Sequence, residues 1–210
     1  METHVKINSE NKTDRRQNGK MMLKPAFIFI LLFFSASVTF GHCDTMDGPL
    51  IKDAKIALEK NNVNYILKWV QPKDESEIKN IFSLAIKVRS LNADARTLSD
   101  NYFFETLVRL HRSGEGVPYT GVKPSGTPVD EKILAADKSI EKGTLLPLKG
   151  LVTNEMLPEL EERFHKVMAL KDFDVNNVKA GREYIEAYVQ FFKYAEGEEE
   201  HDVHAGAHNH

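Results

Sequence analysis

The chain has 210 residues, a formal net charge of −3 at pH 7 and a single cysteine. A lone cysteine excludes an intramolecular disulfide framework. An acidic chain without a basic patch is a poor partner for nucleic acid, because such binding depends on neutralising phosphates. The length suits one domain rather than several.

The N-terminal 41 residues have the layout of a secretory signal peptide behind a polar extension at 1–20. Lys24 is the last basic residue before the apolar run Ala26–Phe34, and small residues follow at 35–39. The apolar run is far shorter than the ~20 residues of a membrane-spanning helix. We therefore expect cleavage after Gly41, export to the periplasm or the cell exterior, and no stable membrane span in the mature chain. An uncleaved leader that anchors the chain in the membrane is the alternative.

Removal of this leader defines the mature chain, residues 42–210. The leader carries six basic and three acidic residues, so its loss takes the net charge from −3 to −6. We expect a helical domain at 42–195 and a disordered, acidic tail at 196–210, whose composition cannot form a core. Histidines of such a tail capture metal ions loosely, and this tail has four: His201, His204, His208 and His210.

Apolar residues recur at helical spacing through most of the domain, and no segment alternates as a strand does. The expected helices cover residues 49–60, 63–70, 74–90, 92–112, 130–142, 154–170 and 175–194. Asp130 and Gly143 are suited to begin and end the fifth of them. In the fourth, the spacing predicts four buried side chains: Leu98, Tyr102, Leu107 and Leu110.

The longest irregular stretch is residues 113–128, with four glycines and three prolines. Its apolar residues Val117, Tyr119 and Val122 favour an ordered loop that covers the domain over a flexible linker. Helices joined in this way predict an all-α fold, a single-domain antiparallel helical bundle with one long Gly/Pro-rich loop.

The candidate chemistry lies at His42-Cys43-Asp44, directly after the expected cleavage point. Cleavage there leaves a free α-amine, a backbone amide, a thiolate and an imidazole within two residues. Nitrogen and sulfur donors in this arrangement favour a square-planar ion, Ni(II) or Cu(II). Asp47 is close enough along the chain to fold back as an oxygen donor, and Met46 is the alternative as a soft thioether donor.

Two residues of the helix expected at 92–112 are candidates to support such a site. Glu105 and His111 lie on neighbouring turns, from which they can approach the metal ligands. The alternative for His111 is a surface histidine near a helix C-terminus, where the dipole favours a cation. The candidate metal residues are therefore His42, Cys43, Asp44, Asp47, Glu105 and His111.

A second histidine motif is weaker. Glu162 and His165 are three residues apart on a helix, as in carboxylate-bridged di-iron bundles. Such sites need a second pair of this kind, which the chain does not have. A solvated helix face is therefore the favoured interpretation.

The competing interpretation is a metal-free structural or interaction module. Cys43 then stays a free thiol or joins two chains into an oligomer. In this case Val117, Pro118 and Tyr119 form part of the contact surface.

The segment that begins at His42 resembles the amino-terminal metal hook of nickel superoxide dismutases. The positions that match the hook are His42, Cys43, Asp44 and Gly48. The positions that depart from it are Met46, Asp47 and Leu50, where the hook has proline, cysteine and tyrosine. The resemblance implies metal binding. It does not extend to superoxide dismutation, because two thiolates tune nickel for redox cycling and this chain has only one.

A wider resemblance covers the mature chain. The strings at 42–49 (HCDTMDGP), 102–109 (YFFETLVR) and 169–175 (ALKDFDV) are similar to an uncharacterised bacterial family of exported helical proteins, DUF6448. The resemblance implies export and a helical fold, and it supplies no activity.

Overall fold

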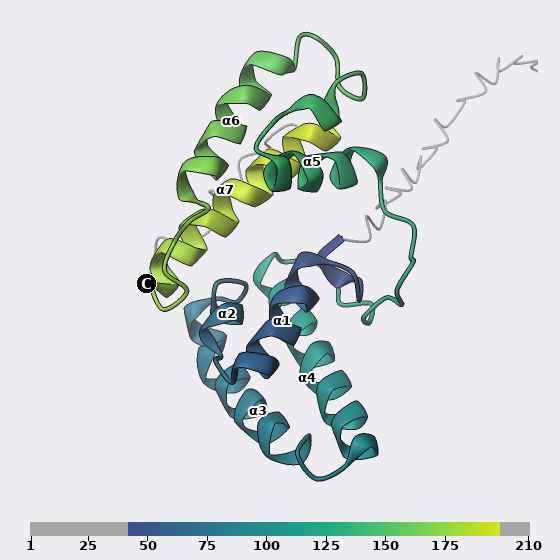
Figure 1. Ribbon diagram of the computed structural model, residues 1–210, viewed down its shortest axis with the longest axis vertical. Coiled ribbons are helices and arrows are strands. Elements are labelled where there is room, and N and C mark those ends of the chain that lie inside the picture. Colours follow the sequence, from purple (N-terminus) through teal and green to yellow (C-terminus); the bar gives the residue numbers. More distant parts are fainter. Residues whose placement is uncertain (1–41, 198–210) are drawn as a thin grey trace, which may run out of the picture. The chain divides into compact units, whose positions relative to one another are not determined.

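The computed structural model describes residues 42–197, which all belong to one compact unit (Figure 1). The α-helices of these residues are α1 (Pro49–Lys60), α2 (Asn64–Leu67), α3 (Glu75–Val88), α4 (Ala93–Gly114), α5 (Glu131–Lys142), α6 (Leu157–Leu170) and α7 (Val178–Glu196). Short 3-10 turns cover His42–Asp44, Pro72–Asp74 and Leu146–Leu148. Within the described residues, extended pairing is limited to isolated bridges, so the predicted all-α single domain is confirmed.

Most predicted boundaries agree with the structure within one or two residues, but α2 ends at Leu67 rather than at residue 70, and two helices begin later than expected. α6 begins at Leu157, because the preceding residues form turns and Pro158 fits a first helical turn. α7 begins at Val178, because the Asn177 side chain caps it by accepting a hydrogen bond from the backbone N–H of Ala180 at 3.1 Å.

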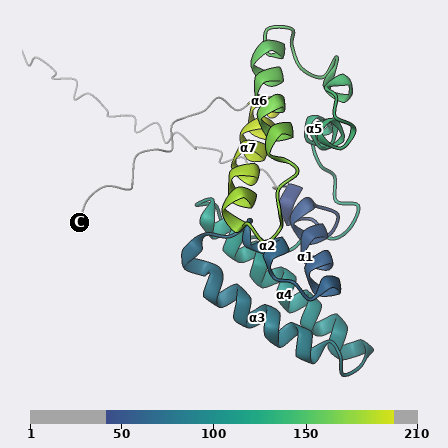
Figure 2. The same cartoon turned by 60° about the vertical axis from the view of Figure 1, so that its left-hand side comes forward.

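Two antiparallel hairpins, α3–α4 and α6–α7, are the most extensively packed pairs of helices (Figures 1 and 2). α1 packs on α2 and α4, and α5 packs on α7. The core between them is aliphatic and aromatic; its largest fully buried side chains include Phe103, Phe191, Leu50, Ile51 and Ile66.

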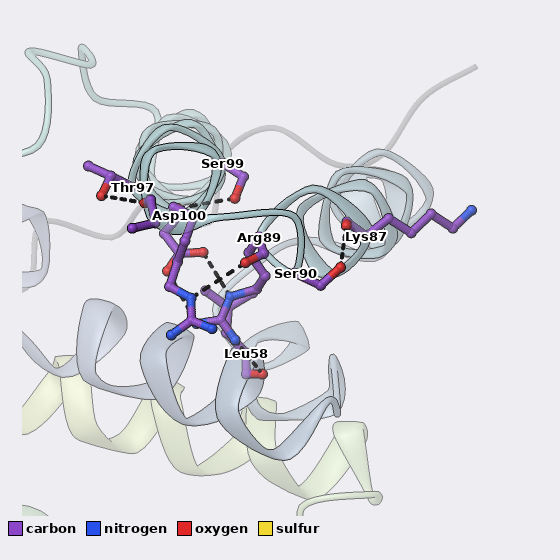
Figure 3. Close-up of polar contacts among 9 residues, drawn as sticks. Leu58, Lys87, Arg89, Ser90, Thr97, Ser99 and Asp100 are labelled. Carbon is purple, nitrogen blue, oxygen red and sulfur yellow. Dashed lines mark hydrogen bonds and ion pairs between the residues drawn. The ribbon is translucent and has the colours of Figure 1, made fainter.

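Arg89 fixes the turn of the α3–α4 hairpin (Figure 3). Its Nε and Nη2 donate to the two carboxylate oxygens of Asp100 at 3.0 and 3.2 Å, and its Nη1 donates to the Leu58 carbonyl at 3.1 Å. Because the guanidinium makes all these bonds at once, it fixes the two helices of the hairpin relative to the end of α1.

The expected burial along α4 is correct for Leu107 and Leu110 and wrong for the other two positions. Leu98 is 73% exposed and Tyr102 is 56% exposed. Phe103 points into the core, and at about 100° per residue Leu98 and Tyr102 lie roughly 140° and 100° around the helix from it. They therefore face outward.

The predicted leader and most of the predicted tail lie outside the described residues. Among residues 42–197, no helix combines the length and the apolar character needed to cross a bilayer.

Arg182 of α7 ties that helix to α2 and α3. Its guanidinium donates to the carbonyls of Val70 and Leu67 at 3.2 and 3.3 Å and to Glu75 Oε1 at 2.6 Å. Hydrogen bonds from Lys79 and Arg182 lower the pKa of the Glu75 carboxyl. The carboxylate therefore contributes stability above the ordinary glutamate pKa, and this contribution is lost as the pH falls through the lowered value.

We expect Glu75→Gln to lower the free energy of unfolding at neutral pH by about 1–2 kcal/mol, because it removes the charge from these bonds. The difference from the wild type should shrink as the pH falls through the lowered pKa, measured by urea denaturation at several pH values. Glu77→Gln is the matched control, since the Glu77–Arg109 pair is about half exposed and should contribute little. Equal losses in both variants would contradict a special role of Arg182.

Candidate metal centre

The polar segment at the start of the domain is buried. His42, Asp44 and Thr45 are 8%, 1% and 2% exposed. The segment closes into a tight turn in which Gly48 N–H donates to the Thr45 carbonyl at 2.9 Å. A Cβ at Gly48 would lie 2.2 Å from the His42 carbonyl oxygen, so only glycine allows this approach.

The Gly/Pro-rich loop holds this segment through backbone hydrogen bonds. Lys123 N–H donates to the Asp44 carbonyl at 2.8 Å, and Met46 N–H donates to the Lys123 carbonyl at 2.9 Å. Together they form the isolated bridge between Thr45 and Lys123. The ordered loop predicted for residues 113–128 is thus confirmed, and it packs on the candidate site.

Asp47 belongs to this attachment. Its carboxylate accepts hydrogen bonds from the Ser125 hydroxyl at 2.7 Å and the Gly126 N–H at 2.8 Å. The Gly126 bond, followed by that of Ser125, lowers the pKa of Asp47. Asp47 therefore anchors the loop and does not turn toward Cys43 as an oxygen donor.

The His42 imidazole is oriented by a carboxylate of α5. Its Nε2 lies 2.5 Å from Asp137 Oδ2, and Asp137 Oδ1 accepts a hydrogen bond from the Tyr188 hydroxyl of α7 at 2.8 Å. Because a carboxylate accepts, Nε2 carries the proton and Nδ1 of the neutral ring carries the lone pair. That Nδ1 is buried and has no hydrogen-bond partner.

The His111 imidazole repeats this arrangement on α4. Its Nδ1 lies 2.9 Å from the Trp69 carbonyl, which can only accept, so Nδ1 carries a proton. Its Nε2 is buried without a hydrogen-bond partner, and Glu115 Oε1 lies 3.5 Å from it. The ring is 5% exposed, so the alternative of a surface histidine is wrong.

Asp44 pairs with the same helix. Its Oδ2 lies 3.4 Å from Arg112 Nε, and its Oδ1 is buried without a hydrogen-bond partner. Burial raises the pKa of the Asp44 carboxyl, and the Arg112 and His111 charges oppose this rise.

Cys43 is a free, half-buried cysteine between these groups. Burial, and then the carboxylates of Glu115, Asp44 and Asp137, raise the pKa of its thiol well above the ordinary value. Without a metal ion the sulfur therefore stays protonated at neutral pH and is a poor nucleophile. We call this group of residues the N-terminal polar cluster: His42, Cys43, Asp44, His111, Arg112, Glu115 and Asp137.

Four of the six candidate metal residues thus come together, and Asp47 and Glu105 do not. Glu105 is exposed, and its Oε2 accepts a hydrogen bond from the Val122 N–H of the loop at 3.4 Å. Six residues separate Glu105 from His111, which at about 100° per residue places them on different sides of α4.

Sequence reasoning missed Asp137, Trp69 and Tyr188. Asp137 had a usable signal, because it lies between Ala136 and Ile140 on the apolar face of its helix, where an isolated carboxylate needs a partner. Trp69 contributes a backbone carbonyl, which no residue pattern identifies.

Within residues 42–197, no three His, Cys, Asp or Glu side chains stand in position to hold a metal ion by themselves. Elsewhere, His165 is 70% exposed and lies 3.7 Å from Glu161, as expected for a solvated helix face.

The family model of the family of unknown function DUF6448 matches residues 47–194, and the chain belongs to this family. The family membership predicted from the resemblance to DUF6448 is thereby confirmed. No curated protein and no solved structure matches the chain significantly.

We expect Gly48→Ala to lower the free energy of unfolding by about 2–4 kcal/mol, because the new methyl group collides with backbone rather than with a movable side chain. Thermal and urea denaturation measure this loss. Gly126→Ala serves as the control for a glycine with open space around it, although its positive φ of 80° adds some strain. A Gly48 variant as stable as the wild type would contradict the tight turn.

Proposed function

We propose that this DUF6448 protein is exported and binds Ni(II) or Cu(II) at its processed amino terminus. One observation carries the proposal. Both imidazoles of the N-terminal polar cluster donate one ring N–H to a protein oxygen, and the other nitrogen of each is buried without a hydrogen bond, that of His111 lying 3.5 Å from Glu115 Oε1. The same cluster contains the single thiol of the chain.

This arrangement is typical of metal-ligating histidines. Such residues donate their second ring N–H to a carboxylate or a backbone carbonyl, which fixes the tautomer and the ring orientation. Asp137 and the Trp69 carbonyl occupy these two roles. A buried acceptor without a partner costs about 1–3 kcal/mol, and a bound cation would remove that cost.

Cleavage before His42 supplies the ligands that the side chains lack. The new α-amine of His42, the amide nitrogen and thiolate of Cys43 and a His42 imidazole nitrogen form an N/S donor set that suits Ni(II) or Cu(II). Asp44 Oδ1 and His111 Nε2 complete the surroundings of this set. The ion would compensate the deprotonation of a thiol that burial otherwise keeps neutral.

The processed terminus and its metal are tested together. We expect the protein isolated after export to begin at His42 and to hold about one equivalent of nickel or copper, measured by intact-mass and elemental analysis. Cys43→Ser should abolish this binding. A protein that begins elsewhere, or a metal-free protein with Cys43 in an intermolecular disulfide, would favour the structural module instead.

Histidine variants separate the cluster from the surface. We expect His111→Gln to weaken metal binding about 10–100-fold, as loss of groups around a metal site does, and the exposed His165→Gln to leave it unchanged. Titration with Cu(II) against a competing chelator measures both. Deletion of residues 198–210 should remove only weakly held ions. Equal behaviour of the two histidine variants would place the ion outside the cluster.

A further inference from the structure

The donor atoms of the N-terminal polar cluster are closed off from solvent. His42 Nδ1, Asp44 Oδ1 and His111 Nε2 are buried, and burial is the largest cause of the raised pKa of the Cys43 thiol. An ion or a reagent in solution therefore reaches these atoms only when part of the surrounding structure moves aside. Access depends on the element around the cluster that opens most easily.

The Gly/Pro-rich loop is the most weakly held of the elements around the cluster. None of its residues 115–128 is buried, whereas α4, α5 and α7 each contribute several side chains to the core. Segments with few buried apolar contacts open at a lower free energy than the core does. The loop is therefore the element that can open while the helices stay folded.

The loop runs along the border of the cluster. At its start, Val117 N–H donates to the Arg112 carbonyl at 3.1 Å; farther along the chain, Lys123 N–H donates to the Asp44 carbonyl at 2.8 Å. Arg112 and Asp44 are both members of the cluster, one from α4 and the other from the terminal segment. The stretch 117–123 therefore connects two sides of the cluster, and its release would uncover them.

One carboxylate fixes the far end of the loop. The Ser125 hydroxyl lies 2.7 and 2.8 Å from the two carboxylate oxygens of Asp47, and Gly126 N–H donates to one of them at 2.8 Å. Hydrogen bonds to a charged acceptor are the stronger kind. All three residues are exposed, so water can replace these bonds when the loop moves.

We propose that the Gly/Pro-rich loop is a gate over the N-terminal polar cluster, held shut by the bonds of Asp47 to Ser125 and Gly126. When these bonds break, the loop leaves the terminal segment and the Cys43 thiol meets solvent. Entry of Ni(II) or Cu(II) by the same route rests on the proposed function, whereas opening of the gate requires no metal.

The rate at which iodoacetamide alkylates Cys43, followed by mass spectrometry of the reduced, metal-free mature chain, tests the gate. We expect Asp47→Ala, which removes both bonds, to raise this rate about tenfold, and Ser125→Ala, which removes one, about fivefold. Asp174→Ala is the matched control and should leave the rate unchanged. Asp174 is also exposed and accepts a hydrogen bond from a backbone N–H, that of Asn176 at 2.9 Å, but it lies in the α6–α7 turn.

The dependence of the alkylation rate on urea separates opening of the loop from unfolding of the domain. Opening of a loop exposes little surface, so the rate should rise only weakly at low urea concentrations. A rate that rises as steeply as global unfolding would overturn the proposal. An unchanged rate in both loop variants, or an equal rise in Asp174→Ala, would do the same. Because the protein is metal-free, failure of the metal-binding proposal leaves this result unaffected.

Discussion

The burial of the polar segment 42–48 is the constraint on which the candidate site depends. Helix α5 holds it through Asp137, α4 through Arg112, and the loop through Lys123 and the residues that bond Asp47. A terminus without these contacts would be a solvated chelate. If this terminus binds a metal ion as we propose, its donors are already fixed in direction, which lowers the entropy cost of binding.

This burial has opposite effects on the sulfur and on the imidazoles. It keeps the Cys43 thiol protonated and therefore unreactive, and it leaves one nitrogen on each of His42 and His111 without a hydrogen bond from the protein. We therefore propose a site that holds an ion rather than one that attacks a substrate. The resemblance to a nickel hook stays a prediction from the sequence, whereas the packing of α4, α5 and the loop around these residues is a feature of the structure.

The two hairpins have the same spacing of apolar residues but differ in how many of these residues are buried. In α6–α7 the apolar residues pack within the chain, and Phe191 and Leu160 are fully buried. In α3–α4 Leu98 and Tyr102 remain exposed after the inner face has packed. Helical periodicity alone predicts that Leu98 and Tyr102 are apolar-face residues, but it does not say which of two faces meets the core.

The sequence by itself determined the helices, their caps at Asp130 and Gly143 and the ordered loop, and it pointed to His42-Cys43-Asp44 as a candidate site, because these depend on local spacing and on residue chemistry. Only the tertiary structure decided that His111 joins this terminus while Glu105 and Asp47 bind the loop, and that Asp137 and the Trp69 carbonyl orient the two imidazoles. The physical reason is that a side chain's partner is set by the rotation of its helix and by contacts between residues far apart in the chain, 95 positions for His42 and Asp137. The spacing of residues along one segment predicts neither the rotation of a helix in the fold nor its contacts with distant segments.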